Sequence, residues 1–211
     1  GQDDVYDSLN FYIGPKDREN CKSVFSDNAN EITSAVKALG LDCPTSTPHI
    51  AQTNGCSENS VRKVTEGTSS VLQQNGFSHQ WWNSAMKCFC FLRNVTEMQH
   101  YGSTPYRARH GVDFCGKRIP FGAEVGYLRF NREAKCVRPE HPFGTKTHRA
   151  LFIGYDCRPG GFWSGDYFLA DAAQLHNADS LGSVRALKVK DIEVGPYWTF
   201  PLISGTLKQP E

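Results

Sequence analysis

The sequence has no long hydrophobic run. No apolar stretch approaches the roughly 20 residues that cross a bilayer, and the N-terminus lacks the basic-then-apolar pattern of a secretory signal. The formal net charge is only +1, so overall charge selects no class of partner. We therefore expect an intracellular protein, nuclear or cytoplasmic, that does not contact membranes. With 211 residues, of which 39% are hydrophobic, the chain can bury a sizeable core and form one or two domains.

Paired cysteine motifs are also missing. The eight cysteines form no C-x-x-C pair and the seven histidines are scattered, which argues against a zinc site. An even number of cysteines is compatible with disulfides in a secreted protein. However, a chain of this length does not need them, and Cys88 lies with Phe89 and Leu92 in an apolar segment, which favours buried, reduced thiols.

The first acidic residue of interest lies between a predicted strand and a predicted helix. Val24 and Phe25 are predicted to form a short buried strand, so Asp27 follows a strand end. Apolar residues recur at helical spacing between Glu31 and Leu39, and Gly40 is predicted to end this helix. The local order is therefore strand, acid, helix.

The second acidic residue follows a predicted loop, residues 43–55, that is rich in proline and polar residues. Ser57 is predicted to cap a helix that begins near Glu58. The predicted buried face of this helix consists of Val61, Val64, Thr68, Val71 and Leu72. If the helix packs across the strand, Asp27 and Glu58 face one cleft and can share Mg²⁺ or Mn²⁺, because Mg²⁺ takes one or two carboxylates and keeps water and phosphate as its other ligands. Such a site suits in-line displacement at phosphorus; the alternative is that both acids are solvated surface residues.

Short motifs occur around and after these acids in a characteristic order. They are SDNANE (26–31), TP (47–48), QTNGCSE (52–58), WWNSA (81–85), RNV (93–95), TPY (104–106), IPFG (119–122) and FIGY (152–155). In this order they resemble the integrase region of a Ty1/copia-type retrotransposon Pol polyprotein, within the retroviral integrase superfamily.

The resemblance implies both a fold and an activity. It implies a partial RNase H-like α/β core without its early strands (residues 1–118), a β-rich SH3-like domain (119–203) and an unstructured tail (204–211). It also implies metal-dependent processing of DNA ends and strand transfer, with Asp27 and Glu58 as the second and third catalytic carboxylates. The expected partners are retrotransposon ends and target DNA, and the full-length protein is expected to be a homo-oligomer.

The first catalytic Asp of this family has no match in the sequence. Asp3, Asp4 and Asp7 lie in a predicted amphipathic helix that ends at Gly14-Pro15, where acids near the start suit the helix dipole. The interval between Asp27 and Glu58 is also shorter than is usual in the family. We therefore expect that the chain begins within the domain and that its catalysis is incomplete.

Positive charge is concentrated in the middle of the chain. Residues 59–150 carry 14 basic and 6 acidic side chains, a net charge of +8. Arg62 and Lys63 lie about one helical turn beyond the second acid, and we predict that they bind the DNA backbone. Gln52 and Asn54 in the preceding loop are further candidates for a base or phosphate contact, although an asparagine before glycine also suits a tight turn. A solvated basic face is the alternative.

A further helix is predicted after residue 76. Ser78 is predicted to cap it, and an aromatic-rich face supports the helix of Glu58. This face consists of Trp81, Trp82, Ala85, Cys88, Phe89 and Leu92.

Beyond Ile119-Pro120 the sequence predicts β-structure. Runs at 123–130, 149–155, 166–170 and 184–194 are rich in Val, Ile, Leu, Phe and Tyr, which predicts the strands of a small barrel or curled sheet. Four cations in this region either continue the DNA-binding track or keep a loop soluble. They are Arg129, Arg132, Lys135 and Arg138.

Three functions are left open by the sequence. The chain is a DNA-integrating polynucleotidyl transferase or part of one, a catalytically inactive nucleic-acid-binding remnant, or a structural or interaction protein. Metal-dependent strand transfer separates the first from the second, and salt-sensitive DNA binding separates the second from the third.

Overall fold

The computed structural model describes residues 2–26, 29–45, 55–128 and 147–210. The described part is a mixed α/β protein with a five-stranded antiparallel sheet. The chain divides into two compact units: unit 1 comprises residues 1–63 and 157–164, and unit 2 comprises residues 64–156 and 165–211. The domain boundary that the sequence predicts at residues 118/119 stays a prediction.

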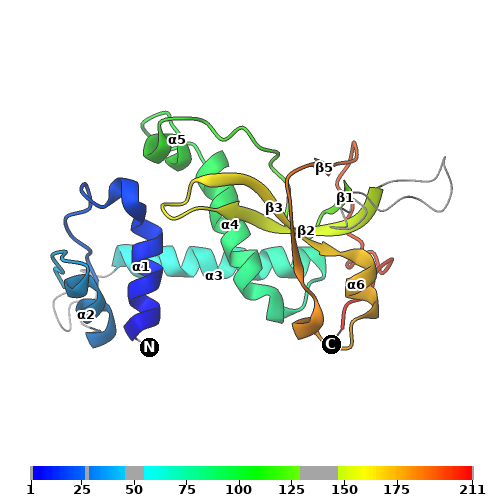
Figure 1. Cartoon of the computed structure of the whole chain (residues 1–211), viewed down its shortest axis with the longest axis horizontal. Helices are drawn as coiled ribbons and strands as arrows, with labels where there is room; N and C mark the ends of the chain where they lie inside the picture. Colours follow the sequence, from blue (N-terminus) through cyan, green and yellow to red (C-terminus); the bar gives the residue numbers. More distant parts are fainter. Residues whose placement is uncertain (1, 27–28, 46–54, 129–146, 211) are drawn as a thin grey trace, which may run out of the picture. The chain divides into compact units, whose positions relative to one another are not determined.

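Unit 1 contains helices α1 (Gln2–Asp17) and α2 (Asn30–Ala38), which lie side by side (Figure 1). The regular part of α1 breaks at Gly14, which has a φ of 68° and precedes Pro15, as predicted. A Cβ at Gly14 would lie 2.5 Å from the backbone nitrogen of Gly160, whose N–H donates to the Phe11 carbonyl oxygen at 2.8 Å. Both the backbone angle and this close approach therefore require glycine.

Helix α2 is flanked by two extended segments that bridge in parallel, Ser23 with Asp42 and Ser26 with Thr45. The helix ends at the predicted Gly40, which has a φ of 73°. The N–H of Gly40 donates to the Lys37 carbonyl and that of Leu41 to the Val36 carbonyl, at 2.9 and 3.2 Å, which is the Schellman pattern.

The predicted buried strand at Val24 and Phe25 is not formed as expected. The segment makes isolated bridges in place of a continuous strand, and the Phe25 side chain is 48% exposed. Two bridges do not build the covered sheet face that would bury alternate side chains.

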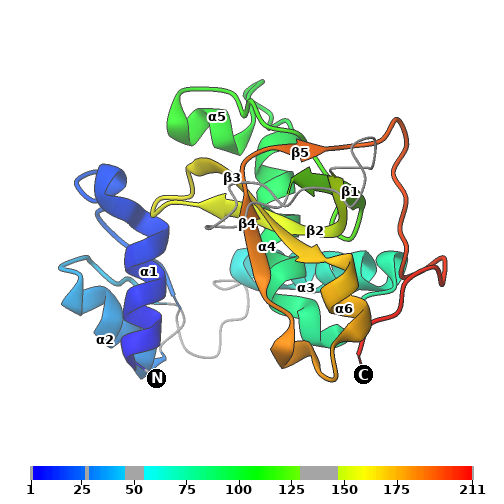
Figure 2. The same ribbon diagram turned by 45° about the vertical axis from the view of Figure 1, so that its right-hand side comes forward.

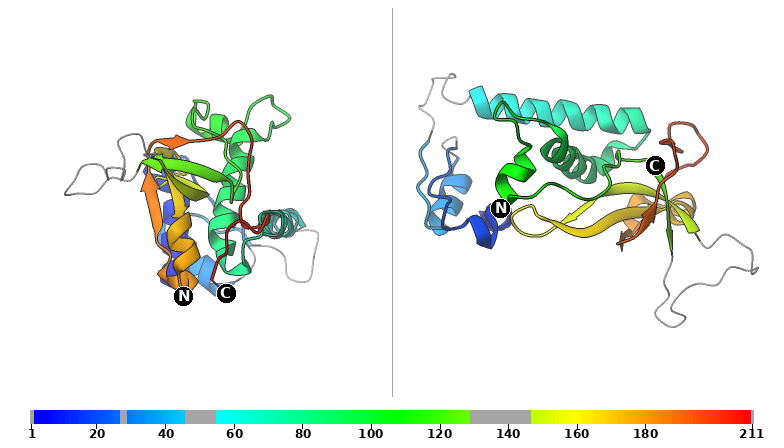
Figure 3. Two further views of the ribbon diagram at one scale, coloured as in Figure 1. Left: turned by 90° about the vertical axis from the view of Figure 1, so that its right-hand side faces the viewer. Right: turned by 90° about the horizontal axis from the view of Figure 1, so that it is seen from above.

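In unit 2, α4 (Trp82–Thr96) lies between the second half of α3 (Gly55–Asn75) and the sheet (Figure 3). Gly67 of α3 makes room for the Phe89 ring of α4, because a Cβ at Gly67 would lie 2.1 Å from Cζ of that ring. A 3-10 turn, His79–Trp81, precedes α4. Ser78 caps this turn by accepting a hydrogen bond from the N–H of Gln80 at 3.3 Å, whereas the N-cap of α4 is Trp81 and not the predicted Ser78.

The buried face of α4 differs from the predicted one. The buried residues are Ala85, Cys88, Phe91 and Val95, whereas the predicted Phe89 and Leu92 are half-buried. Trp82, the first residue of α4, is 56% exposed and not part of the buried face that was predicted. Trp81 belongs to the 3-10 turn and packs edge-on against Phe77, with ring centroids 5.4 Å apart.

The sheet of unit 2 has the strand order β4-β3-β2-β1-β5. Its strands are β1 (Glu124–Leu128), β2 (Thr147–Cys157), β3 (Trp163–Asp171), β4 (Ala186–Val189) and β5 (Ile192–Glu193). Their positions confirm the predicted series of short strands, and residues 157–164 of the β2–β3 hairpin belong to unit 1.

This sheet must be curled. Strands β4 and β5 form its opposite edges, yet only Lys190 and Asp191 separate them in the chain. Three Cα–Cα steps of about 3.8 Å span at most about 11 Å. The edges of a flat five-stranded sheet would lie about 19 Å apart at about 4.8 Å per strand. The two edges are therefore brought together by curvature, which is visible at β4 and β5 in Figure 2.

Three short helical segments complete the described part of unit 2. They are α5 (Pro105–His110), α6 (Ala172–Asn177) and a 3-10 turn (Leu181–Ser183). Asp171 caps α6 by accepting from the N–H of Gln174 at 2.8 Å, and it also accepts from the buried Tyr127 hydroxyl at 2.5 Å. One carboxylate thus joins β1, β3 and α6. No helix among the described residues has the length and apolar content needed to cross a membrane.

The core of unit 2 is centred on Tyr155 of β2. Its ring stacks on Phe91 of α4, with centroids 4.3 Å apart and planes at 28°. Its hydroxyl accepts from the N–H of Ile119 at 2.8 Å and donates to the Lys117 carbonyl at 2.9 Å. Burial raises the pKa of this hydroxyl well above its usual range, so it stays a neutral donor and acceptor.

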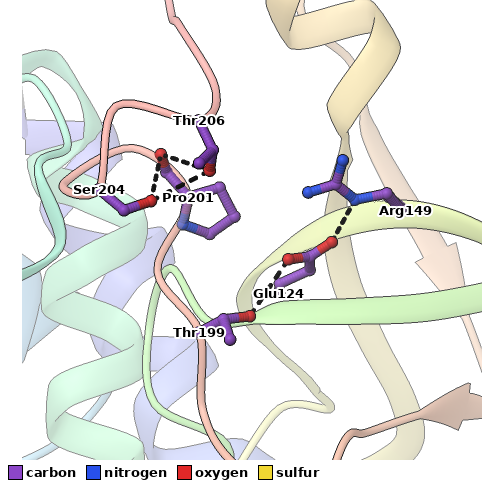
Figure 4. A network of polar contacts seen from close by, with 6 residues as sticks. All are labelled: Glu124, Arg149, Thr199, Pro201, Ser204 and Thr206. Atoms are coloured by element: carbon purple, nitrogen blue, oxygen red, sulfur yellow. Dashed lines mark hydrogen bonds and ion pairs between the residues drawn. The ribbon is translucent and has the colours of Figure 1, made fainter.

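The last described residues are anchored to unit 2. The Gln209 amide donates to the Gly76 carbonyl at 2.9 Å and accepts from the N–H of Ser78 at 3.3 Å. Thr199 donates to Glu124 at 3.1 Å, and Glu124 also pairs with Arg149 (Figure 4). The unstructured tail that the sequence predicts from residue 204 stays a prediction, and the contacts of Gln209 leave no periodic pattern in the sequence.

Removing the Tyr155 hydroxyl should destabilise unit 2. In Tyr155→Phe the ring contacts remain, but the buried N–H of Ile119 and carbonyl of Lys117 lose their partner, so we expect a loss of about 1–3 kcal/mol in the free energy of unfolding. Urea denaturation followed by circular dichroism measures this loss. Tyr197→Phe, at a tyrosine that is 83% exposed, is the matched control and should change nothing. Equal stability of the two variants would contradict the role of the Tyr155 hydroxyl.

Stability should also depend on Glu124 in a pH-dependent way. The hydrogen bond from Arg149 lowers the pKa of Glu124 below its usual range in the folded protein. A lowered folded-state pKa stabilises the fold above the unfolded value and loses this effect as pH falls through the folded value. Wild type should therefore be more stable than Glu124→Gln near neutral pH and lose that advantage as the pH falls through the lowered folded-state pKa of Glu124. A difference that stays constant through acid denaturation would contradict this.

Candidate metal and DNA site on helix α3

Helix α3 carries the predicted site residues that the structure describes. It begins at Gly55, so Ser57 lies within the first turn and does not serve as the predicted N-cap. Glu58 lies in the first turn, as predicted. An acid at this position is favoured by the partial positive charge at the N-terminus of the helix.

The predicted buried face of α3 is correct in its second half. Thr68 and Leu72 are buried, and Val64 and Val71 are half-buried. Val61 is 66% exposed, and all residues from 57 to 63 are exposed. Helix α4 packs against α3 at Gly67, so the apolar residues in the second half of α3 are covered by α4. The first half presents its side chains to solvent.

Glu58 and Arg62 lie on one face of this exposed half. Together with Gly55 and Asn59 they line a shallow hollow in the surface of the helix. Lys63 follows directly and is also exposed. One helical turn thus presents a carboxylate and two cations to solvent.

The two opposite charges in the hollow are not paired with each other. The Nη2 of Arg62 donates to the Oδ1 of Asn59 at 3.0 Å. No ion pair joins Arg62 or Glu58 to any residue in the described part of the chain. Sequence analysis overlooked Asn59, although a neutral acceptor three residues before an arginine on a helix is a recognisable signal.

Other predicted site residues lie outside the described residues. They are Asp27, Gln52 and Asn54, and also Arg129, Arg132, Lys135 and Arg138. The structure describes Ser26, which immediately precedes Asp27 and whose N–H donates to the Pro44 carbonyl at 3.2 Å.

The donor chemistry at Glu58 fits a hard cation. Its carboxylate is exposed and has no cationic partner among the described residues, and carboxylate oxygens are the ligands that Mg²⁺ and Mn²⁺ prefer. Across residues 2–26, 29–45, 55–128 and 147–210, no three His, Cys, Asp or Glu side chains are grouped so that they could hold a metal ion. Of the two carboxylates predicted to share a cation, Asp27 and Glu58, only Glu58 lies among the described residues.

Comparison with known proteins gives structural similarities that are distant. No family model matches the chain. Its structure is similar to a chain in the cryo-EM structure of the simian T-cell lymphotropic virus intasome in complex with the PP2A regulatory subunit B56 gamma, with 13% sequence identity and a TM-score of 0.38. The match covers 93% of this chain and 66% of that chain. At this identity and TM-score, the similarity assigns neither fold nor function.

Proposed function

We propose that the chain is an integrase-type protein of the Ty1/copia class that binds the DNA backbone through the first half of α3 and does not join DNA strands by itself. The observation that carries the proposal is the turn of α3 on which Glu58, Arg62 and Lys63 are all exposed. The ordered motifs of the sequence, which include this turn, support the assignment.

Arg62 and Lys63 would hold the DNA backbone. Both are exposed, and Arg62 has one acceptor, Asn59, in the described part of the chain. A guanidinium has five N–H donors and can bind a phosphate through two parallel hydrogen bonds, whereas a lysine acts as a point charge. These contacts carry no sequence information, so we expect binding that is indifferent to sequence and sensitive to salt.

Asp27 and Glu58 would hold Mg²⁺ or Mn²⁺. When bound, such a cation polarises a phosphoryl oxygen and stabilises the charge that develops during displacement. The role of Glu58 is to offer an unpaired carboxylate next to cations that hold the DNA. Since no residue matches the first catalytic Asp of the family, two acids would hold two metal ions poorly, and we propose no strand transfer by this chain alone.

Two features of the fold support the finer assignment. In unit 1, parallel bridged segments before and after α2 give the strand–helix–strand order expected of an RNase H-like core. In unit 2, the last strand, β5, pairs with the first, β1, and the sheet is curled, as expected of an SH3-like domain. We propose that the first feature belongs to a partial RNase H-like core (residues 1–118) and the second to an SH3-like domain (119–203).

Loss of Arg62 and Lys63 should weaken DNA binding and reduce its salt dependence. For Arg62→Ala/Lys63→Ala, the slope of log affinity against log salt should fall by about two, since each phosphate contact contributes about 0.9. Fluorescence anisotropy with a short labelled DNA duplex, from about 50 to 200 mM salt, measures both quantities.

The matched control is Lys190→Ala/Lys208→Ala, which removes two exposed charges from unit 2. It should retain the wild-type slope. Equal losses in the two double variants would show non-specific attraction, and salt-independent or absent binding by wild type would contradict the proposed function. Joined products from the wild-type chain with Mn²⁺ and DNA ends would contradict the proposed lack of strand transfer.

A further inference from the structure

We infer that Asn59 is a positioning residue: its side-chain amide holds Arg62 away from Glu58 and so keeps the cation and the carboxylate of the site separately available. This inference rests on the proposed function and extends it, because it names the residue that keeps Arg62 free to bind phosphate. Asn59 itself touches neither DNA nor metal in this role.

The geometry offers Arg62 two possible partners on its own helix. Glu58 lies four residues before it and Asn59 three residues before it, and both spacings bring side chains together on a helix surface. Of these two, Arg62 binds Asn59: its Nη2 donates a hydrogen bond to the Oδ1 of Asn59 at 3.0 Å. Among the described residues Arg62 makes no ion pair with Glu58, although all three side chains line one hollow.

The choice of partner decides what the site can bind. If Arg62 paired with Glu58, the carboxylate would weaken the attraction of Arg62 for a phosphate. The guanidinium would likewise weaken the attraction of Glu58 for a cation. A hydrogen bond to a neutral amide uses one of the five guanidinium donors and leaves the charge intact. An exposed i,i+4 ion pair is worth only a factor of about two in equilibrium, so one competing hydrogen bond is enough to decide the outcome.

The test is a cycle of variants measured by DNA anisotropy. In Asn59→Ala the guanidinium loses its neutral acceptor and pairs with Glu58, so DNA affinity should fall about two-fold and the salt slope should move toward that of Arg62→Ala. Alanine is the best helix former, so α3 should be retained, which circular dichroism checks. Asn59→Gln keeps an amide acceptor and should restore affinity.

The decisive comparison is made in a background without the carboxylate. If Asn59 acts by keeping Arg62 from Glu58, then Asn59→Ala should have no effect when added to Glu58→Gln. The same loss in both backgrounds would show a purely structural role and overturn the inference.

Arg62→Ala separates this inference from the proposed function. If Arg62→Ala weakens binding and Asn59→Ala does not, the positioning role is wrong and the proposed function stands. If Arg62→Ala has no effect, Arg62 binds no phosphate, and both are overturned.

Discussion

Unit 2 depends on one buried tyrosine. Tyr155 lies on β2, stacks on Phe91 of α4 and holds the backbone at Lys117 and Ile119 through its hydroxyl. The sheet, the supporting helix and the segment that leads into β1 therefore meet at one side chain. A buried hydroxyl that both donates and accepts a hydrogen bond has little desolvation penalty. Without it, the N–H of Ile119 and the carbonyl of Lys117 would lack a hydrogen-bond partner. This is why the position demands tyrosine and why phenylalanine would fill only its volume.

The charges on the first half of α3 have the opposite character. Glu58, Arg62 and Lys63 are exposed, and exposed substitutions usually change stability by no more than about 0.5 kcal/mol. The stability of the fold therefore depends little on these three side chains. Under the proposed function these side chains serve binding, because each phosphate contact would release counterions and make the logarithm of the affinity fall linearly with the logarithm of the salt concentration. The absence of an ion pair between Glu58 and Arg62 in the described structure fits a surface kept for external ligands.

Local signals in the sequence predicted the breaks in the chain well. Gly14-Pro15 and Gly40 end regular helix where expected, because positive φ and a missing N–H act on the backbone itself. Periodicity predicted which face of a helix is apolar but not whether another element covers it. Val61, Phe25 and Trp82 are exposed although the spacing of the apolar residues predicted that they are buried. The Gln209 anchor depends on long-range contacts to backbone atoms, which no local pattern encodes.

The account depends on Asp27 and Glu58 forming one cation site next to Arg62. Titration of Mn²⁺ into the purified chain, followed through the NMR signals of these two carboxylates, tests it most directly, with Asp27→Asn as the control. The account predicts selective paramagnetic broadening of both signals at the same Mn²⁺ concentration, and loss of the Glu58 effect in Asp27→Asn. Uniform broadening of all exposed acids, or broadening at Glu58 that survives Asp27→Asn, would contradict a shared site.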